Sequence, residues 1–138
     1  MRCAWSWKGL FGSTHGIVVR NAFSENVARH DMEHRELAEG ESAENVILEF
    51  RPQPVQDMLV ACLWSRWEAP GEPELLSFAA ITDEPPAEVA AAGHDRCIIP
   101  IKPEHLDAGL NPDPSNLAAL HAILDDRERP YYEYWMAA

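Results

Sequence analysis

Short apolar runs separated by proline-rich breaks are the feature that most limits how this chain can fold. Four such runs, typical of β-strands, lie at 16–20, 45–51, 58–67 and 75–82. The breaks between the last three are Pro52-Gln53-Pro54 and Pro70-Gly71-Glu72-Pro73, and both have the length of a turn. Neighbouring strands are therefore expected to pair antiparallel through hairpins, with a meander as the simplest arrangement.

The later part of the chain carries the patterns expected of short helices. An alanine-rich segment at 87–93 follows two prolines and ends at Gly93, a common residue type just after a helix. Two further helices are predicted at 103–110 and 114–125, and Asp113 is the expected N-cap of the second. The remaining expectations are an exposed charged loop with some helix at 28–44 and further strands at 96–101 and 131–135.

Length and composition indicate one folded domain spanning 1–138. Of the 138 residues, 46% are hydrophobic and five are Trp, which supplies enough apolar surface for an ordinary core. No run reaches the length of about 18 apolar residues that a membrane span needs, and residues 1–8 lack the apolar region of a secretion signal. A cytoplasmic location with no membrane partner is therefore expected.

The three cysteines, Cys3, Cys62 and Cys97, do not suggest a disulfide or metal framework. Their number is odd and they are widely separated, which suits neither paired disulfides nor a four-thiolate zinc site. Cys62 lies inside an apolar run, and on a strand Cys97 faces away from His94. Cys62 and Cys97 are expected to be buried core residues rather than nucleophiles.

The formal charge of −12 is the main composition-level argument against nucleic acid binding, because affinity for phosphate comes largely from Lys and Arg. The acidic residues are concentrated in 31–49 and 68–88, whereas Arg20, Arg66 and Arg96 lie in segments assigned to a cleft. The local sign of the charge can therefore differ from the net sign. A non-catalytic acidic interaction protein remains one alternative.

A second alternative is a zinc metallopeptidase, because His30-Asp31-Met32-Glu33-His34 matches an inverted zinc-peptidase motif. On a helix, His30 and His34 can share a zinc ion while Glu33 serves as general base. That chemistry also needs a third ligand and a stable helix, and the segment has almost no apolar face. A solvated charged loop with exposed histidines, no metal and no cofactor is expected.

Glu25 and His94 are the residues whose positions favour acid–base chemistry. Glu25 closely follows the run at 16–20, where a chain leaving a sheet can hold a side chain over a cleft, and His94 comes just after the segment at 87–93. A carboxylate and an imidazole can divide general acid and general base duties at neutral pH. From spacing alone, an exposed glutamate and a loop histidine remain the simpler interpretation.

Three segments, in this order, resemble motifs of the SOS-response-associated peptidase (SRAP) family. Residues 18–25 are similar to that family's strand, turn and glutamate segment. Ala61-Cys62-Leu63-Trp64-Ser65-Arg66-Trp67 resembles its Gly-Leu-Trp-Glu-Arg-Trp strand. Residues 78–90 followed by His94-Asp95-Arg96 resemble its threonine-containing strand and His-Asp-Arg signature, and the whole resemblance covers about 11–125.

The resemblance implies a DNA-repair function in the SOS response. Family members shield abasic sites in single-stranded DNA through a covalent bond from an N-terminal cysteine. The implied fold is α+β, with a curved, mostly antiparallel, barrel-like β-sheet and short peripheral helices. Carried over by motif, Glu25 and His94 are the catalytic residues. The residues expected to bind DNA are Trp64, Arg66, Thr82 and Arg96.

The N-terminus departs from the family. Members begin Met-Cys-Gly-Arg, whereas this chain begins Met1-Arg2-Cys3, and the family's first portion has no counterpart here. Cys3 aligns far downstream of the family nucleophile and is not assigned that role. The expectation is a module that binds abasic sites in single-stranded DNA but has lost crosslinking and autopeptidase activity, so whether it is an enzyme stays open. No pattern indicates an oligomeric state.

Overall fold

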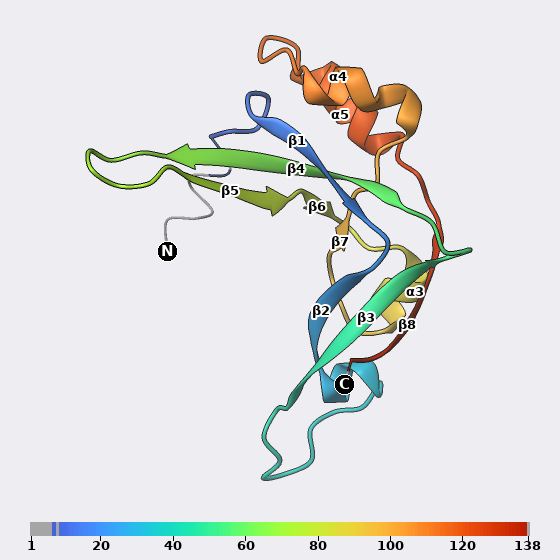
Figure 1. Cartoon of the computed structure of the whole chain (residues 1–138). Coiled ribbons are helices and arrows are strands. Elements are labelled where there is room, and N and C mark those ends of the chain that lie inside the picture. The colour runs from blue at the N-terminus through green and yellow to red at the C-terminus, as the bar shows by residue number, and fades with distance from the viewer. Residues whose placement is uncertain (1–6, 8, 138) are drawn as a thin grey trace. The chain divides into compact units, whose positions relative to one another are not determined.

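The computed structural model describes Trp7 and residues 9–137 (Figure 1). The fold is α+β, with antiparallel strand pairs and short helices, as the resemblance implies. The described strands form separate sheets that do not close into the expected barrel-like sheet. In chain order the described elements are β1 (His15–Arg20), β2 (Phe23–Ala28), α2 (Arg29–Met32), β3 (Asn45–Gln53), β4 (Met58–Trp67), β5 (Leu75–Ala80), β6 (Thr82–Asp83), α3 (Ala87–Ala91), β7 (Cys97–Ile98), the 3-10 turn η1 (Pro103–His105), α4 (Leu106–Leu110), α5 (Leu117–Asp125) and β8 (Tyr131–Met136).

The chain forms two compact units, each assembled from three separate segments. The first unit comprises Met1–Val19, Met58–Ile81 and Ile98–Glu128, and the second comprises Arg20–Asp57, Thr82–Cys97 and Arg129–Ala138. Because the chain passes between the units several times, neither unit is a continuous stretch of sequence.

The first unit contains a three-stranded sheet in the order β1-β4-β5. Strands β4 and β5 form the antiparallel hairpin that the break at 70–73 predicts, with Cys62 opposite Ala80 and Trp67 opposite Leu75. The buried cluster beside this sheet consists of Ala61, Ile99, Ile101 and Leu124. Strand β4 and helix α5 thus contribute to the same core.

The second unit contains a sheet in the order β2-β3-β8, and both outer strands are antiparallel to β3. Leu48 and Phe50 on β3 are fully buried. The predicted hairpin across the break at 52–54 is wrong, because β3 and β4 belong to different sheets. Residues 23–28, for which the sequence predicted no strand, form a full strand against β3.

Helix α3 confirms the segment predicted at 87–93. It ends just before Gly93, whose φ of +103° is a backbone conformation that favours glycine. Helix α5 starts later than predicted, because Asn116 rather than Asp113 is its N-cap and accepts a hydrogen bond from the Ala119 N–H at 3.2 Å. Among the described helices, none has the length and apolar character needed to cross a membrane.

An exposed ion-pair network in the first unit makes the free energy of unfolding depend on pH. Lys102 Nζ lies 2.8 Å from Asp126 Oδ1 and His105 Nε2 lies 2.9 Å from Asp126 Oδ2. Hydrogen bonds from His105 and Lys102 lower the pKa of Asp126 to about 2, against 3.8 ordinarily. A lowered pKa in the folded state means that the stabilisation is present above pH 3.8 and is lost as the pH falls toward 2.

We therefore expect Asp126→Asn to flatten the acid dependence of stability between about pH 4 and pH 2. Urea unfolding at several pH values measures this directly. Asp107→Asn is a matched control, because Asp107 is an aspartate in the same unit whose side chain makes none of these contacts. Equal pH profiles for Asp126→Asn and the unmodified chain would contradict the expectation.

Candidate functional site

Glu25 and His94, 69 positions apart, form a direct side-chain pair in the second unit. His94 Nε2 lies 3.1 Å from Glu25 Oε2, and the two side chains are 17% and 26% exposed, respectively. Glu25 sits in the middle of β2, opposite Leu48 of β3, and His94 follows the glycine that ends α3. The two side chains therefore meet, as one shared site requires.

Both ring nitrogens of His94 face an acceptor oxygen. Nδ1 lies 2.6 Å from the Arg96 carbonyl and 3.2 Å from the Arg96 backbone nitrogen, whose N–H can donate to it, while Nε2 faces the Glu25 carboxylate. In the tautomer whose Nδ1 accepts from that N–H, Nε2 carries the proton and donates it to Glu25. Burial raises the pKa of Glu25, the nearby His94 lowers it and Asp95 raises it. The pair is therefore arranged to hold and transfer a proton.

Close packing at Gly93 brings His94 to strand β2. A Cβ added at Gly93 would lie 2.8 Å from Val27 Cγ1 and 3.1 Å from the backbone carbonyl carbon of Asp31. Glycine allows both this approach and the positive φ. The Glu25–His94 contact therefore depends on a backbone position that only glycine fills without strain.

Thr82 and Arg96 are bound to each other in the same unit. Arg96 Nε donates to Thr82 Oγ1 at 3.1 Å, and Arg96 Nη2 donates to the Thr82 carbonyl. The backbone carbonyl of Arg96 lies 2.6 Å from His94 Nδ1. The Arg96 guanidinium therefore ties β6 to the segment that carries His94, and this holds the histidine ring in place.

Trp64 and Arg66, the other two predicted DNA contacts, belong to the first unit. The backbone N–H of Trp64 donates to the Thr14 carbonyl at 3.0 Å, and Arg66 Nε lies 3.0 Å from Glu74 Oε1. Trp64 is 38% exposed and Trp67 is 51% exposed, so neither of these rings packs in the core. Both residues lie at the outer end of the β4–β5 hairpin, beyond the buried part of β4.

Phe78 is a surface residue that sequence reasoning missed. It stands directly opposite Trp64 in the register and is 55% exposed. Opposed residues on paired strands lie on the same face, as do residues two apart, so Trp64, Arg66 and Phe78 share one face of the hairpin. The sequence could have shown this pairing, because counting residues outward from the break at 70–73 places Phe78 opposite Trp64.

The segment carrying His30 and His34 lacks the geometry of a zinc-peptidase motif. Helix α2 ends at Met32, and His34 has a φ of +56°, so the two histidines do not share a helix face. His34 Nε2 instead contacts the carbonyl of Ala91. The His34 side chain is exposed, as predicted, but that of His30 is only 21% exposed and is therefore mostly covered.

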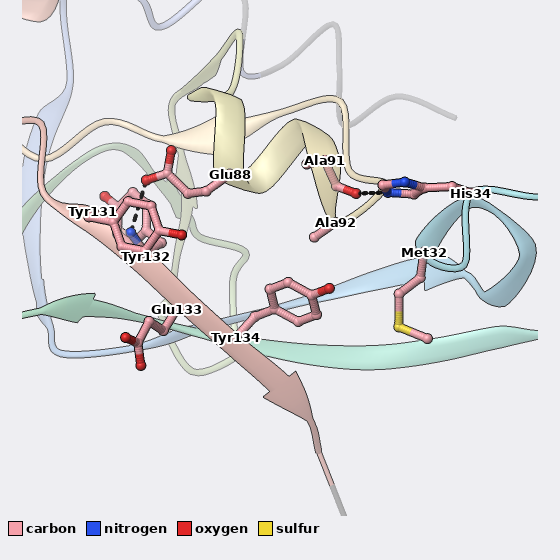
Figure 2. A pocket seen from close by; sticks show the side chains of 9 residues that line it. All are labelled: Met32, His34, Glu88, Ala91, Ala92, Tyr131, Tyr132, Glu133 and Tyr134. Atoms are coloured by element: carbon pink, nitrogen blue, oxygen red, sulfur yellow. Dashed lines mark hydrogen bonds between the residues drawn. The ribbon is translucent and has the colours of Figure 1, made fainter.

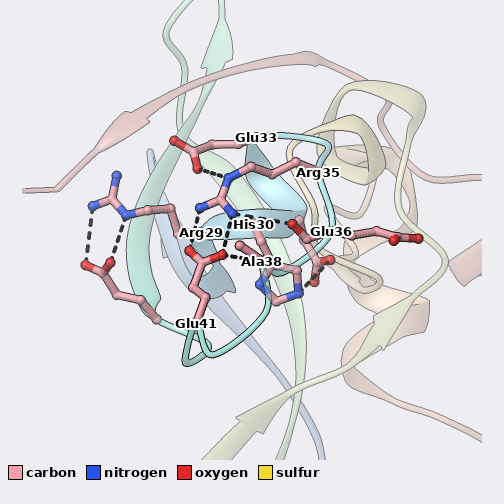
Figure 3. A network of polar contacts seen from close by, with 9 residues as sticks. Arg29, His30, Glu33, Arg35, Glu36, Ala38 and Glu41 are labelled. Carbon is pink, nitrogen blue, oxygen red and sulfur yellow. Dashed lines mark hydrogen bonds and ion pairs between the residues drawn. The ribbon is translucent and has the colours of Figure 1, made fainter.

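Glu33 takes part in an ion-pair network rather than facing a metal (Figure 3). Arg35 Nε lies 2.9 Å from Glu33 Oε1, and Arg35 Nη1 lies 2.8 Å from Glu41 Oε1. Hydrogen bonds from Arg35 and from the Ala38 N–H lower the pKa of Glu41 to about 2. This network orders the loop between β2 and β3.

The described part of the chain shows no exposed cysteine and no metal-binding cluster. Cys62 and Cys97 are buried, as predicted, and burial raises the pKa of Cys62. Within Trp7 and 9–137, no three His, Cys, Asp or Glu side chains are grouped to hold a metal ion. Arg2 and Cys3 lie outside the described residues.

No protein-family model, curated protein or solved structure matches this chain. Interpretation of the site therefore depends on its own residues and geometry.

Proposed function

We propose that this chain is a SRAP-like DNA-repair module that binds abasic sites in single-stranded DNA reversibly. The observation that carries the proposal is the Glu25–His94 pair, whose side chains meet at 3.1 Å from distant parts of the sequence. The SRAP resemblance assigns these two residues to one site, and the observed contact is what that assignment requires.

The chemistry of an abasic sugar suits a carboxylate–imidazole pair. A deoxyribose without its base exchanges between a cyclic form with a free hydroxyl and an open aldehyde. A protonated Glu25 or His94 can donate a hydrogen bond to a sugar oxygen, and the unprotonated group can accept one from a sugar hydroxyl. Such positioning by itself forms no covalent bond and leaves the sugar reversibly bound.

The exposed face of the β4–β5 hairpin offers aromatic rings to unpaired bases. Trp64 and Phe78 are opposed on that face, and base stacking on an aromatic side chain contributes roughly 1–3 kcal/mol per base. Arg66 lies two residues from Trp64 but is paired with Glu74, so its charge is partly neutralised. Stacking is therefore the larger expected contribution of this face.

The binding experiment compares an abasic oligonucleotide with an intact one of the same sequence, by fluorescence anisotropy. We expect the chain to prefer the abasic oligonucleotide, and Glu25→Gln to reduce that preference about tenfold, because a hydrogen bond to a charged group contributes roughly 1.5–3 kcal/mol. Trp64→Ala should weaken the binding of both oligonucleotides about equally, since stacking on the remaining bases does not depend on the missing one. Affinity should fall as salt rises.

Glu39→Gln is the matched control, because it removes the same charge at an exposed position of the same unit. Equal affinity of the unmodified chain for the two oligonucleotides, or an unchanged abasic preference in Glu25→Gln, would contradict the assignment of the site. A denaturing gel after incubation supplies the second readout, and no heat-resistant shifted band is expected. Such a band, if abolished by Cys3→Ala, would show that Cys3 forms an adduct.

A further inference from the structure

The second unit contains a pocket lined by aromatic and acidic side chains (Figure 2). Its volume of about 430 Å³ falls within the range of roughly 300–1,000 Å³ that is usual for small-ligand sites. Neither Glu25 nor His94 lines it. The lining residues come from α3, β8 and the segment just after β2: Met32, His34, Glu88, Ala91, Ala92, Tyr131, Tyr132, Glu133 and Tyr134.

The wall formed by β8 is held rigidly. Tyr132 is 3% exposed, and its ring meets that of Phe23 edge-on with the centroids 5.2 Å apart. The Tyr134 ring lies 5.6 Å from that of Phe50. The Tyr132 N–H donates to Glu88 Oε2 at 2.9 Å, which ties the strand to α3. These contacts fix two tyrosines before any ligand arrives.

The arrangement of the lining side chains leaves an aromatic surface beside a carboxylate. Figure 2 shows Tyr134 pointing from β8 toward Ala92 and Met32, while Tyr131 and Tyr132 lie next to Glu88. The alanine side chains are small, so the α3 side contributes little bulk.

The charge of the lining favours a cation. Glu88 and Glu133 are carboxylates, and none of the nine lining residues is Lys or Arg. The faces of tyrosine rings carry negative potential and attract ammonium groups within about 6 Å of the ring centroid. A net charge of −12 also raises the local concentration of cations around the whole chain. An anion would meet repulsion from the carboxylates of Glu88 and Glu133.

We propose that this pocket binds an alkylammonium group, with the ring of Tyr134 and the charge of Glu88 as the recognising elements. The ligand is a free quaternary ammonium compound or a methylated lysine side chain, which present the same cationic head. This binding is independent of the proposed DNA function, because it uses none of the residues assigned to DNA.

Titration calorimetry with choline, with a trimethyllysine peptide and with the neutral tert-butyl analogue of choline tests the proposal. The neutral analogue has the same shape but no charge. We expect saturable binding of at least one cationic probe, and binding of the neutral analogue at least about fivefold weaker. Tighter binding of the peptide than of choline would identify a lysine side chain as the source of the ammonium group.

Two variants make the test specific. Glu88→Gln keeps an oxygen that can accept from the Tyr132 N–H but removes the charge, and Tyr134→Leu removes one ring. Each should weaken the cationic probe about threefold to tenfold. Trp135→Leu is the control, because Trp135 lies on the same strand but does not line the pocket. Three results would overturn the proposal: equal affinity for the charged and neutral probes, no saturable binding of either cation, or an unchanged affinity for the cationic probe in Glu88→Gln.

Discussion

Gly93→Ala is expected to destabilise the chain by roughly 2–6 kcal/mol, because two costs add. A φ of +103° costs a residue with a side chain roughly 1–3 kcal/mol. The added Cβ would also lie 2.8 Å from Val27 Cγ1 and 3.1 Å from the backbone carbonyl carbon of Asp31, and forcing extra volume into packed structure costs roughly a further 1–3 kcal/mol. Urea unfolding measures the sum.

Gly40→Ala separates these two costs. Gly40 lies in the same unit with a φ of +78°, and a Cβ there would meet nothing within 4 Å. It should therefore show only the backbone cost. Because Gly93 positions His94 against β2, Gly93→Ala should also remove the preference for abasic DNA. A loss of stability no larger than that of Gly40→Ala would show that the contacts at Gly93 relax without strain.

Phe50→Ala is expected to cost about 3–5 kcal/mol, the usual range for removing a fully buried aromatic ring. Phe50 is 0% exposed, and its ring stacks on Phe23 at 5.1 Å and contacts Tyr134 at 5.6 Å. The cavity would open between the three strands of the second sheet. Both the strand that bears Glu25 and the wall of the tyrosine pocket depend on that packing.

Phe78→Ala provides the matched comparison for this loss. The same side chain is removed, but Phe78 is 55% exposed on the hairpin of the first unit. Its loss should change stability by roughly 0.5 kcal/mol or less. Thermal and urea unfolding of both variants give the contrast, and similar losses for the two would mean that the second sheet is not packed as described.

Strand β4 shows how far local patterns reach. Its bounds, Met58–Trp67, coincide with the predicted run, because prolines flank an unbroken stretch rich in apolar residues. Strand β2 shows the opposite case. Ser24, Glu25 and Asn26 have little preference for strands, and the segment is extended because all six of its residues pair with β3.

The candidate site divides in the same way. The resemblance predicted that Glu25 and His94 would meet, but it assigned Thr82 and Arg96 to DNA without indicating that they bind each other. Exposure of both Trp64 and Trp67 was not predictable from alternation along one strand. It follows from the hairpin extending beyond the core, which depends on what packs against each part of the sheet.

The sequence by itself determined where strands and helices can form, because turns, caps and apolar runs are set by residues adjacent in the chain. Only the tertiary structure decided which strands pair. Strand β3 pairs with β2 and β8 and not with β4, its neighbour in the sequence. That choice places Glu25 beside His94 and the tyrosines of β8 beside Glu88. This strand pairing depends on contacts between residues far apart in the sequence, and the free energies of those contacts cannot be read from a local sequence pattern.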